Sequence, residues 1–217
     1  MNTDSLRFPR GLYGITPEWD DTDRLLDAVD AAFQGGMVAL QWRRKTCTPE
    51  AGLAQVRRVA DHCRQLGLVF IVNDDWRLAA LVNADGVHLG RDDGSLTAAR
   101  LALGPEKILG CSCYNDPGLA TQALSADVDY IAFGAMYPSS IKPNAPRATL
   151  AHIVQARAMV ESQPSRPRPA VVAIGGLTPD NAAAVVHAGA DSIALISGLF
   201  ERPDIRAAAA GCATLFA

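Results

Sequence analysis

Short apolar runs alternate with longer amphipathic segments along the whole chain. The runs are almost continuously hydrophobic, which is typical of parallel strands whose two faces are both covered by helices. The segment 23–36 illustrates the helices, because Leu25, Val29 and Phe33 recur near the 3.6-residue period before a Gly-Gly pair ends it. The expected strands lie at 11–16, 37–43, 68–74, 86–90, 107–113, 129–137, 170–176 and 192–200.

Eight strands, each followed by a helix, predict an α/β fold of the (β/α)8 barrel type. We expect residues 1–217 to form a single TIM-barrel domain, with 1–10 as an N-terminal extension. The proline-rich stretch 162–169 is too short to separate two domains. A doubly wound open sheet is the alternative, but it normally carries a glycine-rich loop after its first strand, and GLYGITPEW is a poor version of one.

Charge and cysteine content narrow the class of protein. The net charge of −3 and the pI of about 5.8 give no electrostatic basis for binding nucleic acid or an anionic membrane. No segment approaches the ~20 apolar residues of a membrane span, and no signal-peptide pattern opens the chain. The odd number of cysteines, five, indicates free thiols and a cytoplasmic location. We interpret Cys111 and Cys113 as residues on one face of a strand rather than as metal ligands.

The loops that follow the strands of a barrel meet at one face, where the active site lies. Polar residues and glycines follow most of the expected strands, whereas Asp85 and Asp129 precede strands and should lie at the opposite, structural end. The candidates at the active face are Gln41, Arg43, Lys45, Asn73, Asp74, Asp92, Asp93, Ser112, Ser139, Ser140, Lys142, Gly175, Gly176, Ile196 and Ser197.

The motif QWRRK (41–45) predicts an anion-binding clamp. Gln41 and Arg43 are two positions apart, so both side chains lie on one side of an extended segment, and Lys45 continues the row. A guanidinium and an ammonium group on one side suit phosphate or pyrophosphate. The alternative is a solvated basic strand end whose cations pair with carboxylates on the helices.

Two acidic pairs, Asp74–Asp75 and Asp92–Asp93, follow neighbouring strands. Carboxylates on adjacent loops can converge, and one or two of them together with substrate phosphate oxygens are the usual ligands of Mg²⁺. The alternative interpretation assigns these residues to helix capping and turns. Beside the basic clamp, both interpretations stay open.

The last two expected strands end in AIGG (173–176) and in Ile196–Ser197. Backbone N–H groups of glycines and of a helix N-terminus form a phosphate site here in many barrels, although a glycine pair also makes a tight turn. His88 in GVHLG is a weaker candidate for acid–base chemistry than for a place in the core. No Ser-His-Asp order or reactive-cysteine signature is present.

Together these motifs resemble the thiamine phosphate synthase family. The resemblance runs from GLYGIT to IALIS and rests on the order and spacing of QWRRK, ND, ADGVHLGRDD, GCS, FGAMYPSSIK, AIGG and LIS. It implies a transferase that couples 4-amino-2-methylpyrimidine methyl pyrophosphate with a thiazole phosphate to give thiamine phosphate and pyrophosphate, with Mg²⁺ as cofactor. It also implies small phosphorylated molecules as partners, and a homodimer is the candidate assembly.

The resemblance further implies roles for individual residues. Asp74 and Asp93 would bind Mg²⁺. The catalytic residues that assist the departure of pyrophosphate would be Arg43, Lys142 and Ser112. The pyrimidine pyrophosphate would contact Gln41, Arg43, Lys45, Asn73, Ser112 and Lys142, and the thiazole phosphate would contact Ser139, Ile141, Gly176, Ile196 and Ser197.

Three positions depart from the family pattern. Ile141 stands where many relatives have Thr, so we expect weaker binding of the thiazole phosphate. Arg91 replaces a common Gln and Asp75 a common Arg, and the hypothesis is that these two have exchanged charge across neighbouring loops. The alternatives to a synthase are a thiazole tautomerase-like paralogue, which would carry His in place of Tyr114, a non-catalytic barrel that binds phosphate ligands, and a phosphosugar isomerase or epimerase.

Overall fold

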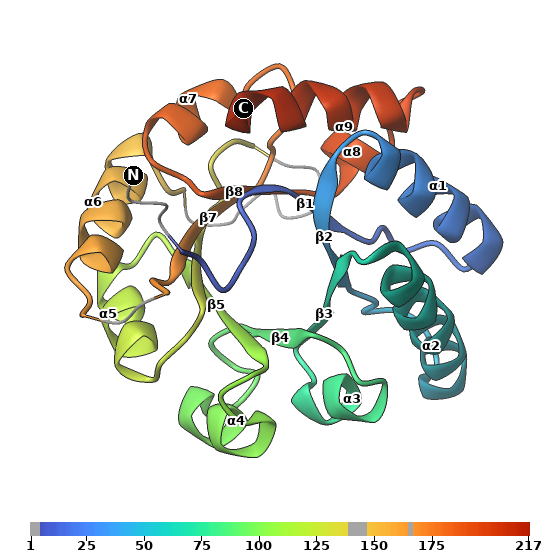
Figure 1. The fold of residues 1–217 in the computed structure, drawn as a ribbon, viewed down its shortest axis with the longest axis horizontal. Helices are drawn as coiled ribbons and strands as arrows, with labels where there is room; N and C mark the ends of the chain where they lie inside the picture. Colours follow the sequence, from blue (N-terminus) through green and yellow to red (C-terminus); the bar gives the residue numbers. More distant parts are fainter. Residues whose placement is uncertain (1–4, 139–146, 165–166) are drawn as a thin grey trace.

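The computed structural model describes residues 5–138, 147–164 and 167–217. Parallel strands close into a barrel in the order β1 to β8, and helices surround it (Figure 1), which confirms the predicted (β/α)8 fold. The strands are β1 (Gly11–Ile15), β2 (Met37–Trp42), β3 (Val69–Asn73), β4 (Gly86–Leu89), β5 (Ile108–Tyr114), β6 (Tyr130–Phe133), β7 (Ala170–Ile174) and β8 (Ser192–Leu195). The helices are α1 (Thr22–Gln34), α2 (Pro49–Leu66), α3 (Trp76–Leu81), α4 (Leu96–Leu103), α5 (Pro117–Ser125), α6 (Leu150–Glu161), α7 (Ala183–His187), α8 (Ser197–Phe200), α9 (Ile205–Ala213) and the 3-10 turn η1 (Thr214–Phe216).

Two strands, β6 and β8, end well before the apolar pattern predicts, whereas the ends of the others differ from the prediction by at most two residues. β6 ends at Phe133, and a Cβ on the next residue, Gly134, would lie 2.3 Å from the carbonyl oxygen of Ile174. β8 ends at Leu195, and the apolar residues that follow it form the short helix α8 instead of more strand. An apolar run by itself does not separate a buried strand from a buried helical turn, which explains the difference at β8.

The barrel interior is a separate apolar layer from the one between strands and helices. Alanine at several inward positions leaves space for the rings of Tyr13, Tyr130 and Phe8, all of which are buried. The inner layer comprises Phe8, Tyr13, Ile15, Ala39, Ile71, Ile108, Tyr130, Ala132, Ala170, Val172 and Ala194.

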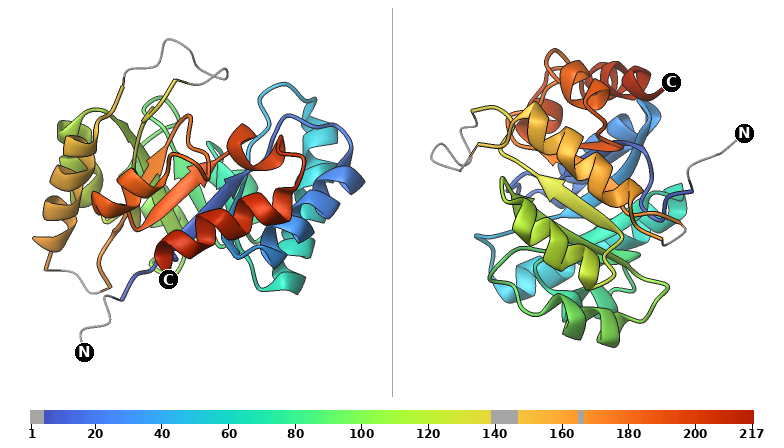
Figure 2. Two further views of the ribbon diagram at one scale, coloured as in Figure 1. Left: turned by 90° about the horizontal axis from the view of Figure 1, so that it is seen from above. Right: turned by 90° about the vertical axis from the view of Figure 1, so that its left-hand side faces the viewer.

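The segment before β1 closes the end of the barrel where the strands begin. Phe8 is 0% exposed, and its ring centroid lies 4.9 Å from that of Tyr13 and 4.3 Å from that of Tyr130. Leu6 forms a strand-like bridge with Arg168. Figure 1 shows this dark blue segment crossing the middle of the barrel, and the side view places it at one end (Figure 2). Residues 5–10 of the expected extension therefore pack into the barrel.

Three aspartates fix the beginnings of the even-numbered strands β4, β6 and β8. Asp85, Asp129 and Asp191 each accept a hydrogen bond from a backbone N–H of the preceding strand. Asp85 and Asp129 lie at the end of the barrel where the strands begin, as the sequence predicts. The donors are the N–H groups of Phe70, Leu109 and Val171, at 2.7, 2.7 and 2.9 Å.

Among the described residues, no helix is both long and apolar enough to cross a membrane.

Candidate active site

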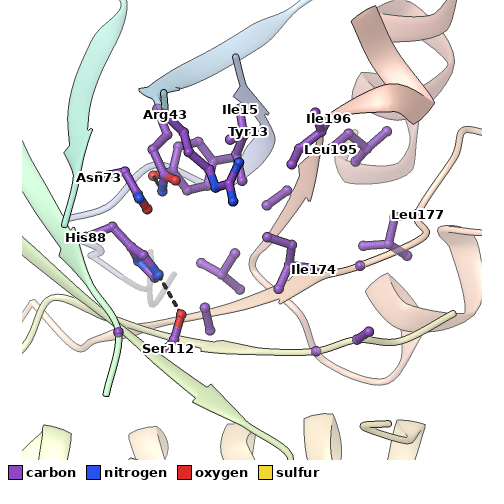
Figure 3. A pocket seen from close by; sticks show the side chains of 18 of the residues that line it. Tyr13, Ile15, Arg43, Asn73, His88, Ser112, Ile174, Leu177, Leu195 and Ile196 are labelled. Atoms are coloured by element: carbon purple, nitrogen blue, oxygen red, sulfur yellow. Dashed lines mark hydrogen bonds between the residues drawn. The ribbon is translucent and has the colours of Figure 1, made fainter. Parts of the chain in front are cut away.

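A cavity of about 850 Å³ opens where the strands end. This is the face on which barrel enzymes carry their active sites. Polar side chains such as Arg43, Asn73 and His88 lie on one side of it, and apolar ones such as Ile174 and Leu195 lie on the other (Figure 3). The sequence-predicted residues in its lining are Gln41, Arg43, Lys45, Asn73, Asp74, Asp92, Asp93, Ser112, Gly175, Gly176, Ile196 and Ser197. Ser139, Ser140, Ile141 and Lys142 lie outside the described residues.

The side chains of the basic motif at the end of β2 point alternately into the cavity and away from it. Gln41, Arg43 and Lys45 line the cavity, as the two-residue spacing predicts. Trp42 points the other way, and its indole N–H donates to Oε1 of Gln55 on α2 at 3.1 Å. The cavity therefore receives one amide, one guanidinium and one ammonium group from this strand end.

A carboxylate from the β1 loop holds this motif in place. Nη1 of Arg43 lies 3.2 Å from Oε1 of Glu18, and the backbone N–H of Lys45 donates to the same oxygen at 3.0 Å. Partial burial by itself would raise the pKa of Glu18, but these donors, the Thr46 hydroxyl and the charge of Arg44 together lower it. Glu18 is not among the residues that the sequence predicts for the site, because contacts across 25 or more positions leave no local pattern.

Asp74 and Asp93 converge at the ends of β3 and β4. Burial raises the pKa of Asp93, and a hydrogen bond with the Asp74 carboxylate raises it further. Oδ2 of Asp93 also accepts from the N–H of Gly90 at 2.7 Å, and the Lys45 ammonium group pairs with Asp74. Two hard oxygen donors with mutually unfavourable charge suit a divalent cation that takes its remaining ligands from phosphate and water. Within the described ranges, no cluster of three or more His, Cys, Asp or Glu offers a complete metal site.

The other acidic residues have structural positions. Asp75 is the N-cap of α3, and its Oδ1 accepts from two backbone N–H groups of that helix at 2.9 and 3.0 Å. Asp92 is exposed in the turn before α4. The guanidinium of Arg91 lies 5.3 Å from the ring centroid of Tyr114. Asp75 thus caps a helix and Arg91 lies over an aromatic ring, and their exchange of charge stays a hypothesis.

A row of polar side chains forms the floor of the cavity. His88 is 8% exposed, so it lies in the core as expected, yet both of its ring nitrogens contact hydroxyl groups. These are Tyr130 at 2.9 Å and Ser112 at 2.8 Å, and the row continues through Tyr13 to Gln41. Sequence analysis missed the two tyrosines, although a tyrosine in a buried strand signals a hydroxyl group that needs a partner.

The glycine pair after β7 is required by packing. Gly175 and Gly176 have φ angles of +96° and +64°, which disfavour any side chain. A Cβ on Gly176 would lie 2.5 Å from the carbonyl oxygen of Pro138. The pair is thus a tight turn, and it also brings backbone into the cavity at the end of the strand next to β8, which is followed by Ile196 and Ser197.

Known proteins that resemble this chain agree with its fold and motifs. The family model described as thiamine monophosphate synthase matches residues 12–199. The thiamine-phosphate synthase of Bordetella pertussis is 58% identical over 212 residues, which are 98% of this chain and 97% of the relative. That of Thiobacillus denitrificans is 49% identical over 210 residues, or 97% and 96% of the two chains.

A solved structure supports the same relationship. The thiamine phosphate pyrophosphorylase from Pyrococcus furiosus superposes with a TM-score of 0.80 at 30% identity, covering 97% of this chain and 96% of that one. Family model, relatives and structure therefore agree over almost the whole length of the chain. The chain belongs to the thiamine monophosphate synthase family and is a transferase.

Proposed function

We propose that this protein couples 4-amino-2-methylpyrimidine methyl pyrophosphate with a thiazole phosphate, giving thiamine phosphate and pyrophosphate in a Mg²⁺-dependent reaction. One observation carries the proposal: a single cavity brings together the basic row from β2, two converging carboxylates and the glycine turn after β7. Two anion-binding ends in one cavity suit a reaction between two phosphorylated substrates.

The β2 side of the cavity would hold the pyrophosphorylated substrate. Its described contacts are Gln41, Arg43, Lys45, Asn73 and Ser112, and Lys142 would join them from outside the described residues. Arg43 has a planar guanidinium that binds phosphate oxygens in pairs, whereas Lys45 acts as a point charge. Both cations lie close to carboxylates here, Glu18 and Asp74, which keep them in position for an incoming anion.

Asp74 and Asp93 would hold the Mg²⁺. The ion would supply positive charge to the pyrophosphate oxygens as the bond to the methylene carbon breaks. Arg43, Ser112 and Lys142 would stabilise the same developing charge through fixed hydrogen bonds. The electron-rich pyrimidine can stabilise the resulting cation, and the thiazole nitrogen then attacks it, so bond formation needs no general base.

The β7–β8 side would hold the thiazole phosphate. Gly176, Ile196 and Ser197 border the cavity there, and Ser139 and Ile141 would complete the contacts from outside the described residues. Backbone N–H groups replace the hydroxyl that Ile141 lacks. We further propose a cytoplasmic location and a homodimer as the assembly to test by sedimentation.

A coupled assay tests the proposal. Purified protein should release pyrophosphate and form thiamine phosphate only when both substrates and Mg²⁺ are present, and EDTA should abolish both products. Arg43→Ala should lower turnover while the circular dichroism spectrum stays unchanged. Conversion of a thiazole phosphate without the pyrimidine would instead support the tautomerase alternative. Binding of both ligands without any product would support the non-catalytic one.

A further inference from the structure

Five side chains from five strands form an unbroken row of hydrogen bonds across the floor of the cavity. The row begins on β2, passes through β1, β6 and β4, and ends on β5. It runs from Gln41 to Tyr13 (2.8 Å), Tyr130 (3.0 Å), His88 (2.9 Å) and Ser112 (2.8 Å). Figure 3 shows its last link, from His88 to Ser112, at the cavity surface.

The first link gives the row a direction. The Gln41 atom that meets Tyr13 is Nε2, an amide nitrogen that only donates. Nε2 cannot accept the proton of Tyr13, and among the described contacts of this hydroxyl group only the oxygen of Tyr130 can accept it. Tyr130 in turn has one proton, and its remaining contact in the row is Nδ1 of His88, which must accept it.

Counting protons then settles the state of the histidine. An Nδ1 that accepts carries no hydrogen, so the imidazole is neutral and its proton lies on Nε2. Nε2 lies 2.8 Å from Oγ of Ser112, so with its proton on this nitrogen His88 donates to the serine. Since Oγ already accepts from His88, the hydroxyl proton of Ser112 points away from the histidine.

We propose that this row holds His88 as its Nε2–H tautomer and thereby presents the Ser112 hydroxyl to the cavity as a hydrogen-bond donor to an anionic oxygen. Tyr13, Tyr130 and His88 are positioning residues, and Ser112 is the group that touches the ligand. The identity of the anion, a pyrophosphate, rests on the proposed function, whereas the direction of the row does not.

Burial protects the row from reorientation by water. Tyr13 is 1% exposed and Tyr130 is 0% exposed, and the ring of Phe8 packs on both from below. Burial also raises the pKa of each tyrosine well above its ordinary value, so each keeps the one proton that the counting requires. The rings of His88 and Tyr130 are nearly parallel, at 16° with centroids 5.5 Å apart, which fixes the imidazole plane.

The direction has a chemical consequence. A serine that donates stabilises negative charge as it grows on a leaving group, and a fixed donor needs no reorganisation during the reaction. The reverse direction would make His88 accept from Ser112 and would turn a lone pair of Oγ toward the anion. The Gln41 amide on β2 therefore orients the hydrogen bonds so that the Ser112 hydroxyl on β5 favours an anionic ligand.

Nuclear magnetic resonance of the ligand-free protein tests the direction without any substrate. Long-range ¹H–¹⁵N correlations of the His88 ring, assigned by their loss in His88→Asn, show which nitrogen carries the proton. We expect the Nε2–H tautomer. An Nδ1–H tautomer or a doubly protonated ring at neutral pH would overturn the proposal.

A pair of matched variants tests whether the row is the cause. Tyr130→Phe removes the donor to Nδ1 and should convert the single tautomer into a mixture. Tyr137→Phe removes a hydroxyl that donates to the Asn181 carbonyl oxygen outside the row, and it should leave the tautomer unchanged. A pure Nε2–H signal in Tyr130→Phe would show that the row does not set the tautomer.

Binding of inorganic pyrophosphate, measured by titration calorimetry with Mg²⁺, tests the consequence. Ser112→Ala should weaken binding by about tenfold, the usual effect of one hydrogen bond to a charged group. Tyr130→Phe alone should weaken pyrophosphate binding by less than Ser112→Ala does. The double variant should bind pyrophosphate as weakly as Ser112→Ala alone. Additive losses would contradict the positioning role. If wild-type protein binds no pyrophosphate while the tautomer is as expected, the proposed function fails and the direction of the row stands.

Discussion

Two carboxylates at the ends of β3 and β4 place like charge at one point of the cavity. Burial raises the pKa of Asp93, and the neighbouring Asp74 carboxylate raises it further, so the ionised form of Asp93 is disfavoured here. The Lys45 ammonium group pairs with Asp74 and lowers the pKa of Asp93, so it offsets part of this repulsion. Residues that bind a cation often lower the stability of the protein when the cation is absent.

Asp93→Asn should therefore separate stability from activity. It should lower kcat/KM by roughly a hundredfold or more, because fixed charge stabilisation in the transition state is lost. It should leave the Tm of the metal-free protein unchanged or raise it, because the repulsion is removed. Steady-state kinetics at saturating Mg²⁺ and scanning calorimetry in EDTA measure the two effects. Asp92→Asn, a neutralisation at the exposed neighbour, is the matched control, and equal turnover in both variants would contradict the metal role.

Glu18 gives a pH dependence of stability with a defined sign. Its pKa is lowered in the folded protein, so its contribution is fully present above the ordinary value of 4.5 and is lost as the pH falls through the lower, folded pKa. Urea unfolding of wild type and Glu18→Gln between about pH 7 and pH 3 measures it. The difference in free energy of unfolding should be constant near neutrality and should shrink in acid. A difference that is independent of pH would contradict the charge-based role.

At the scale of elements, buried charge fixes where strands begin. Asp191 at the start of β8 receives two hydrogen bonds from the Arg168 guanidinium, both at 2.8 Å, and Arg168 is 2% exposed. The same carboxylate accepts from the N–H of Val171 on β7. It therefore links the start of β8 to β7 and to the residues that precede β7. Contacts at this end of the barrel stabilise the fold, whereas the candidate active site lies at the other end.

Asp191→Ala should destabilise the protein without changing the site. Leaving the Arg168 guanidinium buried without this partner should lower the free energy of unfolding by about 3–5 kcal/mol. Asp180→Ala, which removes an exposed pair with Arg202, should cost only about 0.2–1 kcal/mol. Denaturant titration measures both, and kcat per folded molecule should stay at the wild-type level. Equal losses in the two variants would show that burial of the pair is unimportant.

At the scale of the whole molecule, residues ahead of the first strand complete the barrel. Phe8 fills the space beneath Tyr13 and Tyr130, and the inner alanines leave that space open. Phe8→Ala should lower the free energy of unfolding by about 3–5 kcal/mol, because a large side chain is removed from a closed core. Leu101→Ala, at a leucine that is 87% exposed, should change it by less than about 0.5 kcal/mol. Urea denaturation compares them, and a small loss for Phe8→Ala would mean that the segment is dispensable.

The parts of the site that follow from sequence are those with local patterns. Gln41, Arg43 and Lys45 share a face through strand alternation, and Asp74 and Asp93 meet because neighbouring parallel strands end side by side. The roles of these residues stay predictions. Glu18, Tyr13 and Tyr130 could not be found this way, because each acts through contacts more than twenty positions away.

The sequence by itself determined the succession of strands and helices, because continuous apolar runs and amphipathic segments leave one economical way to bury both faces of a parallel sheet. It also placed Gln41, Arg43 and Lys45 on one face of a strand end, and all three line the cavity. Only the tertiary structure decided that Glu18 holds the basic motif, that Phe8 closes the barrel, and that a row of hydrogen-bonded side chains leads from Gln41 to Ser112. Those contacts depend on closure of the barrel, which brings the side chains of distant strands to one floor and gives each buried hydroxyl a single partner for its proton.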